Sequence, residues 1–326
     1  MTARPKATGA RGVPLPRGRE TRVLGVFAHP DDETFFAGAT LAAYAAAGCT
    51  VRLVSLTAGE AGIVGVAAAR AAAGEPDQVA IDAAADRGAA RYARACQALG
   101  VKDSGVIGGR RWRDLGPVPV PGSRAGPLAA SSAEPLTGTP AEPSTGALAE
   151  AGAIAAIVAC VKQTLTEVSP DVVLTVSDDG VTGHPDHITC HRAVRQALGL
   201  FAAEGRKIPL TLGGCVRTKD VRAAWERLAL LTPTRPLGEG GIRGCAREED
   251  LVALQFTEPS VQAKRTALDT YAPGLGTQPL DALVAGQTSV GDGVLLRAIA
   301  EVAGMDREFF QPLVHGRGSA QTTVRS

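Results

Sequence analysis

The sequence predicts an α/β protein whose mostly parallel sheet is flanked by helices. Short apolar runs, which are typical of strands buried on both faces, alternate along the chain with Ala-rich stretches that favour helix. Such alternation indicates strand–helix–strand units, which build parallel sheets. Polar stretches directly follow four of the expected strands, so they should share the sheet edge where such proteins bind ligands.

The individual elements follow from this pattern. The run RVLGVFA at residues 22–28 is the first expected strand, and the helix behind it is expected to end at Gly48, a favourable C-terminal cap. Further strands are expected at 50–56, 101–107 and 171–177, and further helices at 78–99, 147–167, 188–201, 261–271 and 295–303. Together these elements predict a single Rossmann-like domain.

Three stretches are expected to lie outside the folded core. Residues 1–21 are basic and lack the apolar stretch of a secretory signal, which predicts a disordered tail. Residues 117–145 are rich in Pro, Ala, Ser and Gly, which predicts a flexible insertion in a domain that spans 22–315. Residues 316–326 are expected to form a C-terminal tail.

The composition argues against several classes of protein. Lys and Arg number 34 and Asp and Glu number 33, and this net charge of +1 argues against nucleic-acid or anionic-membrane partners. No run of 18 apolar residues occurs, so no membrane span is expected. The six cysteines include no C-x-x-C pair, which fits free thiols in a reducing cytoplasm. We therefore expect a cytoplasmic protein, and the sequence leaves homo-oligomerisation open.

Two His-Pro-Asp tripeptides stand out, because the chain holds only five histidines. The first lies in HPDD at 29–32 and follows the first expected strand, and the second lies in HPDH at 184–187 and follows the strand at 171–177. Each tripeptide continues with a residue able to bind a metal ion. Because both stretches are expected at one edge of the sheet, they predict a shared site.

The residue types suit a catalytic metal ion. Zinc in hydrolases takes three protein ligands and leaves one position open, and His29, Asp32 and His187 would supply two imidazoles and a carboxylate. Asp31 lies between two of these ligands and could act as a general base on water beside the ion. His184 could protonate a leaving group or stabilise an oxyanion.

Other roles for the same residues remain open at this point. Asp186 is a candidate partner that fixes an imidazole tautomer. Asp31 or Asp32 could simply cap the helix that follows. His191 could be a fourth ligand, although a helix residue whose hydrogen bonds are satisfied is the better interpretation, because a fourth protein ligand would close the site.

The stretches AHPDDE at 28–33 and GHPDH at 183–187 resemble the LmbE-like, PIG-L family of zinc-dependent N-acetylglucosaminyl deacetylases, and most of all its mycothiol deacetylase and mycothiol-conjugate amidase branch. The similarity runs from about residue 22 to residue 310. The resemblance implies one zinc ion per chain, with another divalent ion as the alternative. It implies His29, Asp32 and His187 as ligands, Asp31 as the base and His184 as a histidine that assists at the transition state.

Further positions also resemble the family or depart from it. WRDLG at 112–116 is similar to the family's WRDSG, which implies that Asp114 contacts the sugar, and Glu60 in LTAGE matches a loop near the substrate. Thr182 stands where the mycothiol enzymes have a tyrosine that helps at the oxyanion. KRTALDTY, which ends at Tyr271, is similar to the family's K-x-x-A-L helix end, although Tyr271 replaces a histidine.

The resemblance implies a hydrolase that removes the N-acetyl group from an N-acetylglucosaminyl-type conjugate. The expected partner is therefore a small molecule, this amino sugar conjugate. One alternative is a zinc amidase that cleaves a larger acyl amide, such as a mycothiol S-conjugate. A second is a non-catalytic sugar-binding relative, which an intact base at Asp31 disfavours. A nucleotide-binding Rossmann domain is disfavoured because the chain lacks the G-x-G-x-x-G fingerprint.

Overall fold

The computed structural model describes residues 6–7, 18–60, 78–108, 112–114, 146–148, 152–232, 242, 244–245, 248–285 and 291–313. Its main sheet has eight strands in the order β1-β9-β10-β8-β7-β2-β3-β4. These strands are β1 (Lys6–Ala7), β2 (Arg22–Phe27), β3 (Thr50–Ser55), β4 (Asp103–Val106), β7 (Val172–Val176), β8 (Leu210–Cys215), β9 (Val252–Gln255) and β10 (Arg307–Pro312). A separate parallel pair joins β5 (Trp112–Arg113) to β6 (Gly146–Ala147).

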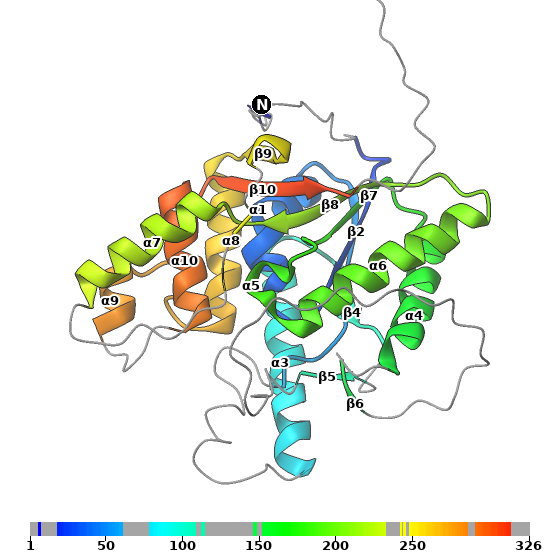
Figure 1. Cartoon of the computed structure of the whole chain (residues 1–326), viewed down its shortest axis with the longest axis horizontal. Coiled ribbons are helices and arrows are strands. Elements are labelled where there is room, and N and C mark those ends of the chain that lie inside the picture. Colours follow the sequence, from blue (N-terminus) through cyan, green and yellow to red (C-terminus); the bar gives the residue numbers. More distant parts are fainter. Residues whose placement is uncertain are drawn as a thin grey trace, which may run out of the picture.

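The helices cover both faces of this sheet (Figure 1). They are α1 (Asp32–Ala46), α3 (Gln78–Ala98), α4 (Ala153–Val168), α5 (Gly180–Gly183), α6 (Pro185–Ala203), α7 (Thr218–Leu231), α8 (Glu258–Tyr271), α9 (Leu280–Ala285) and α10 (Asp292–Ala303), with a 3-10 turn at Glu248–Asp250. None of these helices is long and apolar enough to cross a bilayer. All six cysteines are free thiols.

The predicted fold class is confirmed, because β8, β7, β2, β3 and β4 pair in parallel in that order. The last third of the chain adds strands that the sequence pattern did not indicate. The β10 strand runs antiparallel to both β8 and β9. It is short and carries charged residues, and β8 contains two glycines, so neither shows the long apolar run that marks a buried strand.

The outcome for the expected tails and insertion is mixed. Lys6–Ala7, within the tail expected to be disordered, pairs antiparallel with β9. The edge of β9 offers unpaired backbone N–H and C=O groups, which explains how two residues without an apolar pattern join the sheet. The insertion predicted at 117–145 and the tail at 316–326 lie outside the described residues.

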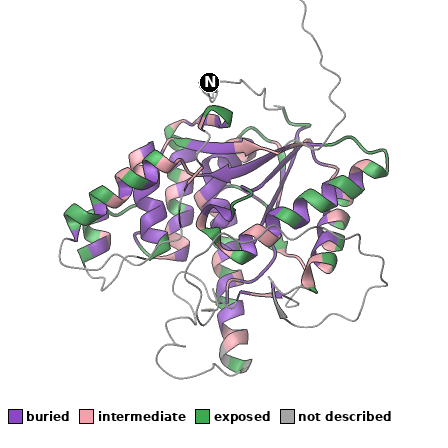
Figure 2. Ribbon diagram, viewed as in Figure 1, coloured by how far each residue is buried: buried purple, intermediate pink, exposed green. Residues whose placement is uncertain are grey.

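Alternation along the strands divides the core into two layers. In β2, Val23 and Phe27 pack into a cluster with α1, α3, α7, α8 and α10, whereas Leu24 and Val26 pack with α4 and α6 on the other face. Successive side chains of a strand point to opposite faces, so one buried strand feeds both layers. The sheet is accordingly buried throughout its centre, while the outer faces of the helices are exposed (Figure 2).

The strand order creates a topological switch point beside β2. From β2 the chain moves outward through β3 to β4, whereas β7 returns to the other side of β2 and leads on to β8. The connections that leave the carboxyl ends of β2 and β7 therefore diverge, and such a topological switch point is where α/β sheets bind ligands. The first His-Pro-Asp tripeptide lies in the turn between β2 and α1, and the second lies at the start of α6, with His184 as its N-cap.

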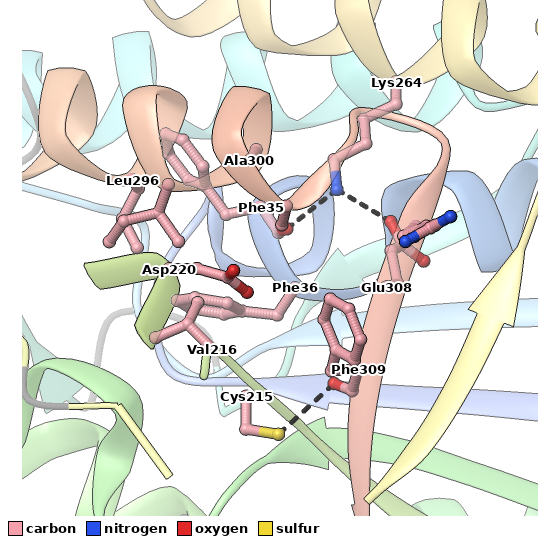
Figure 3. A pocket seen from close by; sticks show the side chains of 13 residues that line it. Phe35, Phe36, Cys215, Val216, Asp220, Lys264, Leu296, Ala300, Glu308 and Phe309 are labelled. Atoms are coloured by element: carbon pink, nitrogen blue, oxygen red, sulfur yellow. Dashed lines mark hydrogen bonds and ion pairs between the residues drawn. The ribbon is translucent and has the colours of Figure 1, made fainter. Parts of the chain in front are cut away.

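A buried ion pair from the C-terminal part of the chain holds α1 in place (Figure 3). Lys264 Nζ lies 2.8 Å from Oε1 of Glu308 and donates a 3.0 Å hydrogen bond to the Phe35 carbonyl. The Glu308 carboxylate also accepts the backbone N–H groups of Ala39 and Thr40 at 2.8 and 2.9 Å. A side chain that accepts from donors in the helix interior fixes both the position and the rotation of α1.

We expect Glu308→Ala to destabilise the protein by about 3–5 kcal/mol, because it leaves the buried Lys264 ammonium without its counter-charge. Glu248→Ala is the matched control, since its partner Lys219 Nζ lies 2.6 Å away at an exposed site and such pairs contribute about 0–1 kcal/mol. Urea unfolding followed by circular dichroism measures both. Equal losses in the two variants would contradict the role given to Glu308.

Candidate metal centre and active site

The site begins with His29, which lies in the four-residue turn, residues 28–31, between β2 and α1. Its Nε2 lies 3.1 Å from Oδ2 of Asp186, and its Nδ1 lies 3.1 Å from Nε2 of His187. Because a carboxylate only accepts, the proton of neutral His29 is placed on Nε2, and Nδ1 is left with its lone pair. Asp186 thus selects the tautomer of His29 that offers Nδ1 to an ion.

His187 is oriented in the same way by the backbone. Its Nδ1 lies 2.9 Å from the carbonyl oxygen of Gly180, so Nδ1 carries the proton and Nε2 faces His29. Gly180 has a φ of 69°, and a Cβ there would lie 3.0 Å from the Cβ of His187. Glycine is required at this position because another residue would both strain the turn and crowd the imidazole.

Asp32 completes a three-residue donor set. It is the first residue of α1, and its Oδ2 accepts the backbone N–H of His29 at 3.0 Å. Its Oδ1 lies 3.2 Å from His187 Nε2, and Oδ2 lies 3.8 Å from His29 Nδ1. Burial raises the pKa of this carboxyl, but the facing imidazoles outweigh that effect and lower its pKa to about 2.

This arrangement fits a tetrahedral metal ion. The ligand atoms of a zinc ion with bonds of about 2.0–2.1 Å lie about 3.4 Å apart. His29 Nδ1 lies 3.1 Å from His187 Nε2, and the Asp32 carboxylate approaches His187 through Oδ1 at 3.2 Å and His29 through Oδ2 at 3.8 Å. The chemistry of the donor set agrees, since imidazole with one carboxylate suits zinc and its neighbours in the transition series. Two groups of described residues have single donor atoms that all lie within 4.8 Å of one another, and Asp32 belongs to neither: His29, His184 and His187 form one, and His29, Asp114, His184 and Asp186 form the other.

The charges around His29 show why a cation is favoured there. Burial lowers the pKa of His29, but the carboxylates of Asp114, Asp186 and Asp32 outweigh burial and raise it to about 10. Three buried carboxylates therefore surround one imidazole. A divalent ion at Nδ1 would neutralise this excess of negative charge more completely than a single proton does.

Asp31 lies between two ligands but takes neither a ligand position nor a capping role. It precedes α1 with a φ of 115° and makes no side-chain hydrogen bond to the helix amides. Within the described residues, no donor is hydrogen-bonded to its carboxylate. Burial and the neighbouring charges of Asp32 and Glu33 raise the pKa of this carboxyl. In its ionised form this half-buried carboxylate can accept a proton from a nearby water molecule.

His184 caps α6 with one ring nitrogen, and its ring lies beside those of His29 and His187. Its Nδ1 accepts the backbone N–H of Asp186 at 3.2 Å, so the proton of the neutral ring is placed on Nε2. Burial, followed by the charges of His29 and His187, lowers its pKa to about 4. The ring lies edge-on to His29, with centroids 5.0 Å apart. His184 therefore offers a neutral N–H donor.

The three candidate substrate contacts occupy different positions. Asp114 Oδ1 lies 3.8 Å from His29 Nε2, and its backbone N–H donates to Glu60 Oε2 at 2.9 Å. Both of these carboxylates are buried, so the short strand β5 carries Asp114 into the site. Thr182 lies in the short helix α5, just before α6, where its hydroxyl accepts the N–H of His184 at 3.3 Å. Its hydroxyl lies 3.5 Å from His187 Nδ1.

Two further residues clarify the site. His191 lies one turn beyond His187, and its Nδ1 is 2.9 Å from the Val176 carbonyl, so it has a backbone partner.

Glu33 was not selected from the sequence, although it is the last residue of the HPDDE stretch. It is fully buried and accepts the Asp31 N–H at 3.0 Å. Its position directly after Asp31 and Asp32 in the sequence was the available signal.

Fold and donor set together define an α/β protein with a candidate metal centre at its topological switch point. A family model described as "PIG-L: GlcNAc-PI de-N-acetylase" matches residues 24–198, which is more than half of the chain. The chain therefore belongs to the PIG-L family. The matched segment contains both His-Pro-Asp tripeptides, as the sequence resemblance implied.

Several relatives bear the name 1D-myo-inositol 2-acetamido-2-deoxy-alpha-D-glucopyranoside deacetylase. That of Thermobifida fusca is 37% identical over 56% of this chain and 56% of its own length. That of Rhodococcus opacus is 31% identical over 80% of this chain and 84% of its own length. Matches to the first relatives, including 53% of the Salinispora arenicola protein, span about half the length of those proteins.

Solved structures share the fold at low identity. The zinc-inhibited form of teicoplanin deacetylase has a TM-score of 0.54 at 17% identity, with 92% of this chain and 100% of that chain covered. A 4-carboxy-2-hydroxymuconate hydratase from Pseudomonas putida has a TM-score of 0.50 at 16% identity, with 92% and 98% covered. Since a hydratase shares this fold with deacetylases, the site residues have to carry the functional argument.

We expect His187→Ala to lose most of its bound divalent ion, because it removes one of three ligands. His191→Ala is the matched control, since it deletes a buried imidazole one turn along the same helix that faces a carbonyl. Metal analysis by mass spectrometry after dialysis measures both. Full occupancy in His187→Ala would refute the ligand assignment.

We expect Asp186→Ala to weaken metal binding about 10–100-fold, because it removes the acceptor that fixes the His29 tautomer. A competition titration with a fluorescent chelator measures the affinity. Wild-type affinity in this variant would show that the contact between Asp186 and His29 does not set the donor nitrogen.

Proposed function

We propose that this protein is a zinc-dependent hydrolase that removes the N-acetyl group from an amino sugar conjugate. The observation that carries the proposal is the convergence of His29 Nδ1, His187 Nε2 and the Asp32 carboxylate. A half-buried acid, Asp31, lies between two members of this set in the sequence. A metal site with three protein ligands and a carboxylate beside it is the arrangement that amide-hydrolysing zinc enzymes use.

In this proposal His29, Asp32 and His187 hold the ion, while Asp186 keeps His29 in the required tautomer. When bound, zinc supplies a Lewis acid that polarises the amide carbonyl and makes water more acidic. The Asp31 carboxylate takes the proton of the attacking water. The raised pKa of Asp31 has burial as its first cause, which favours the protonated form that this transfer produces.

His184 stabilises the charge that develops on the former carbonyl oxygen. Its capping bond to Asp186 leaves Nε2–H as a fixed donor, and a donor aimed at a developing oxyanion lowers the barrier. The C–N bond then breaks as the nitrogen takes the proton that Asp31 gained from water, either directly or by relay through His184. The products are acetate and the free amine, so water has been added across the amide.

The substrate class is supported by the site and by the names of the relatives. Asp114 and Glu60 are buried acceptors beside His29, suited to the hydroxyl groups of a sugar. The Rhodococcus opacus relative, which matches most of this chain, is named as the deacetylase of a glucosamine–inositol conjugate. Six free thiols support a reducing compartment, the cytoplasm.

The decisive experiment compares acyl groups and aglycones. The zinc-loaded protein is incubated with 1D-myo-inositol 2-acetamido-2-deoxy-α-D-glucopyranoside, with free N-acetylglucosamine, and with an N-acylglucosamine that carries a long chain. We expect acetate release from at least one acetylated sugar, with loss of activity after chelation. Cleavage of the long-chain amide alone would favour an amidase, and cleavage of none would refute the proposal.

We expect Asp31→Asn to bind zinc with near-normal stoichiometry and to cleave the amide about 10²–10⁴-fold more slowly, because it keeps the shape of the base and removes its basicity. Asp32→Asn is the comparison, since it should lose the metal instead. Metal content and single-turnover cleavage are measured side by side. If Asp31→Asn lost zinc and Asp32→Asn kept it, the two roles would be exchanged.

A further inference from the structure

The backbone of Asp31 is strained, and one buried carboxylate holds it. Asp31 has a φ of 115° and a ψ of −31°, a conformation that residues with a Cβ rarely adopt. Its N–H donates a 3.0 Å hydrogen bond to Oε2 of Glu33. Strain of this kind persists only where surrounding contacts impose it, and it is found most often at functional sites.

Glu33 is itself held from the far end of the fold. It is completely buried, and its second oxygen, Oε1, accepts the hydroxyl of Tyr271 at 2.8 Å and the hydroxyl of Thr34. Both carboxylate oxygens therefore have donors. A buried carboxylate whose position is set on both sides transmits a displacement at one partner to the other, because the packed interior leaves it little room to adjust.

Tyr271 is the last residue of α8, which packs along α1. The same helix carries Lys264, whose ammonium binds the Phe35 carbonyl one turn into α1. Two polar contacts from α8 therefore fix the start of α1, one to Glu33 and one to Phe35. Of these two contacts, only the one to Glu33 involves the side chain that accepts the Asp31 N–H.

We propose that Tyr271 and Glu33 are positioning residues that hold the strained Asp31 backbone, and with it the Asp31 carboxylate, in the geometry for proton transfer. Neither residue touches the substrate in this proposal. It rests on the role of Asp31 as base in the proposed function. In this proposal the Tyr271 hydroxyl, which lies 240 positions from Asp31 in the sequence, affects the rate of the chemical step through its hydrogen bond to Glu33.

The central variant is Tyr271→Phe, which removes one oxygen and keeps the ring in the core. We expect single-turnover cleavage of the acetylated sugar to slow about tenfold, in line with the loss of a hydrogen bond to a charged acceptor. KM and zinc stoichiometry are expected to stay within twofold of wild type. Tyr44→Phe is the matched control, since it deletes the hydroxyl of a buried tyrosine farther along α1 and should leave the rate unchanged.

Two variants test whether the effect passes through Glu33 and Asp31. Glu33→Gln retains a carbonyl oxygen for the Asp31 N–H, while its amide can donate to the hydroxyls of Tyr271 and Thr34, so it should be faster than Glu33→Ala. In an Asp31→Asn background, Tyr271→Phe should slow the residual reaction by less than twofold, because interacting residues are not additive.

Hydrogen exchange supplies a readout that does not depend on activity. The Asp31 amide is expected to exchange faster in Tyr271→Phe than in wild type or Tyr44→Phe, in metal-free protein as well as in loaded protein. A general loosening of the fold would speed exchange across α1 and lower the unfolding midpoint, and that result would overturn the positioning role.

The failures of the two proposals are distinguishable. If Asp31→Asn cleaved the substrate at the wild-type rate, the assignment of Asp31 as base would fall, whatever Tyr271→Phe did. If Asp31→Asn were slow but Tyr271→Phe matched Tyr44→Phe in rate and in Asp31 exchange, the positioning proposal alone would fall. Equal loss in Glu33→Gln and Glu33→Ala would also overturn it.

Discussion

The parallel pairing of β2 with β7 is the constraint on which the site depends. It joins Val23 to Val172 and Gly25 to Leu174 in register, although these segments lie far apart in the sequence. Because both strands end at one edge, His29 and His187 emerge side by side with ring nitrogens 3.1 Å apart. Each imidazole is then oriented by a contact of its own, a carboxylate for His29 and a backbone carbonyl for His187. Sheet topology therefore brings the two imidazoles together, and their individual hydrogen bonds then set which nitrogens face each other.

Most strands and helices between residues 22 and 203 could be predicted from local pattern, and the reason is physical. The strands β2 and β7 are buried on both faces, so most of their residues are apolar. The strand β10 lies at the antiparallel side of the sheet and contains Glu308, whose carboxylate belongs to the core only because α1 and Lys264 surround it. No local pattern reveals a charged residue whose partners lie 269 positions away.

The candidate site shows the same division. His29, Asp32 and His187 could be selected from the sequence because metal ligands impose both a residue type and a spacing, and their role as a donor set stays a prediction. The function of Asp186 as the partner of His29 rather than of a nearer histidine required the fold, since the sequence brings Asp186 closest to His184 and His187. Glu33 and Tyr271 were invisible as a pair for that reason too, because a hydrogen bond between two helices leaves no periodic trace in either.

The ion pair of Lys264 and Glu308 also has a consequence for the order of events during synthesis. The residues of α1 leave the ribosome early, whereas the carboxylate that accepts their N–H groups is made more than 260 residues later. Contacts of such long sequence separation form slowly, because the entropy of closing the loop has to be overcome first. An unfinished chain could pair β2 with β7 and gather its imidazoles, yet α1 would lack the carboxylate that fixes its rotation. The nascent protein would therefore assemble its metal-binding residues before the helix that carries Asp32 is locked.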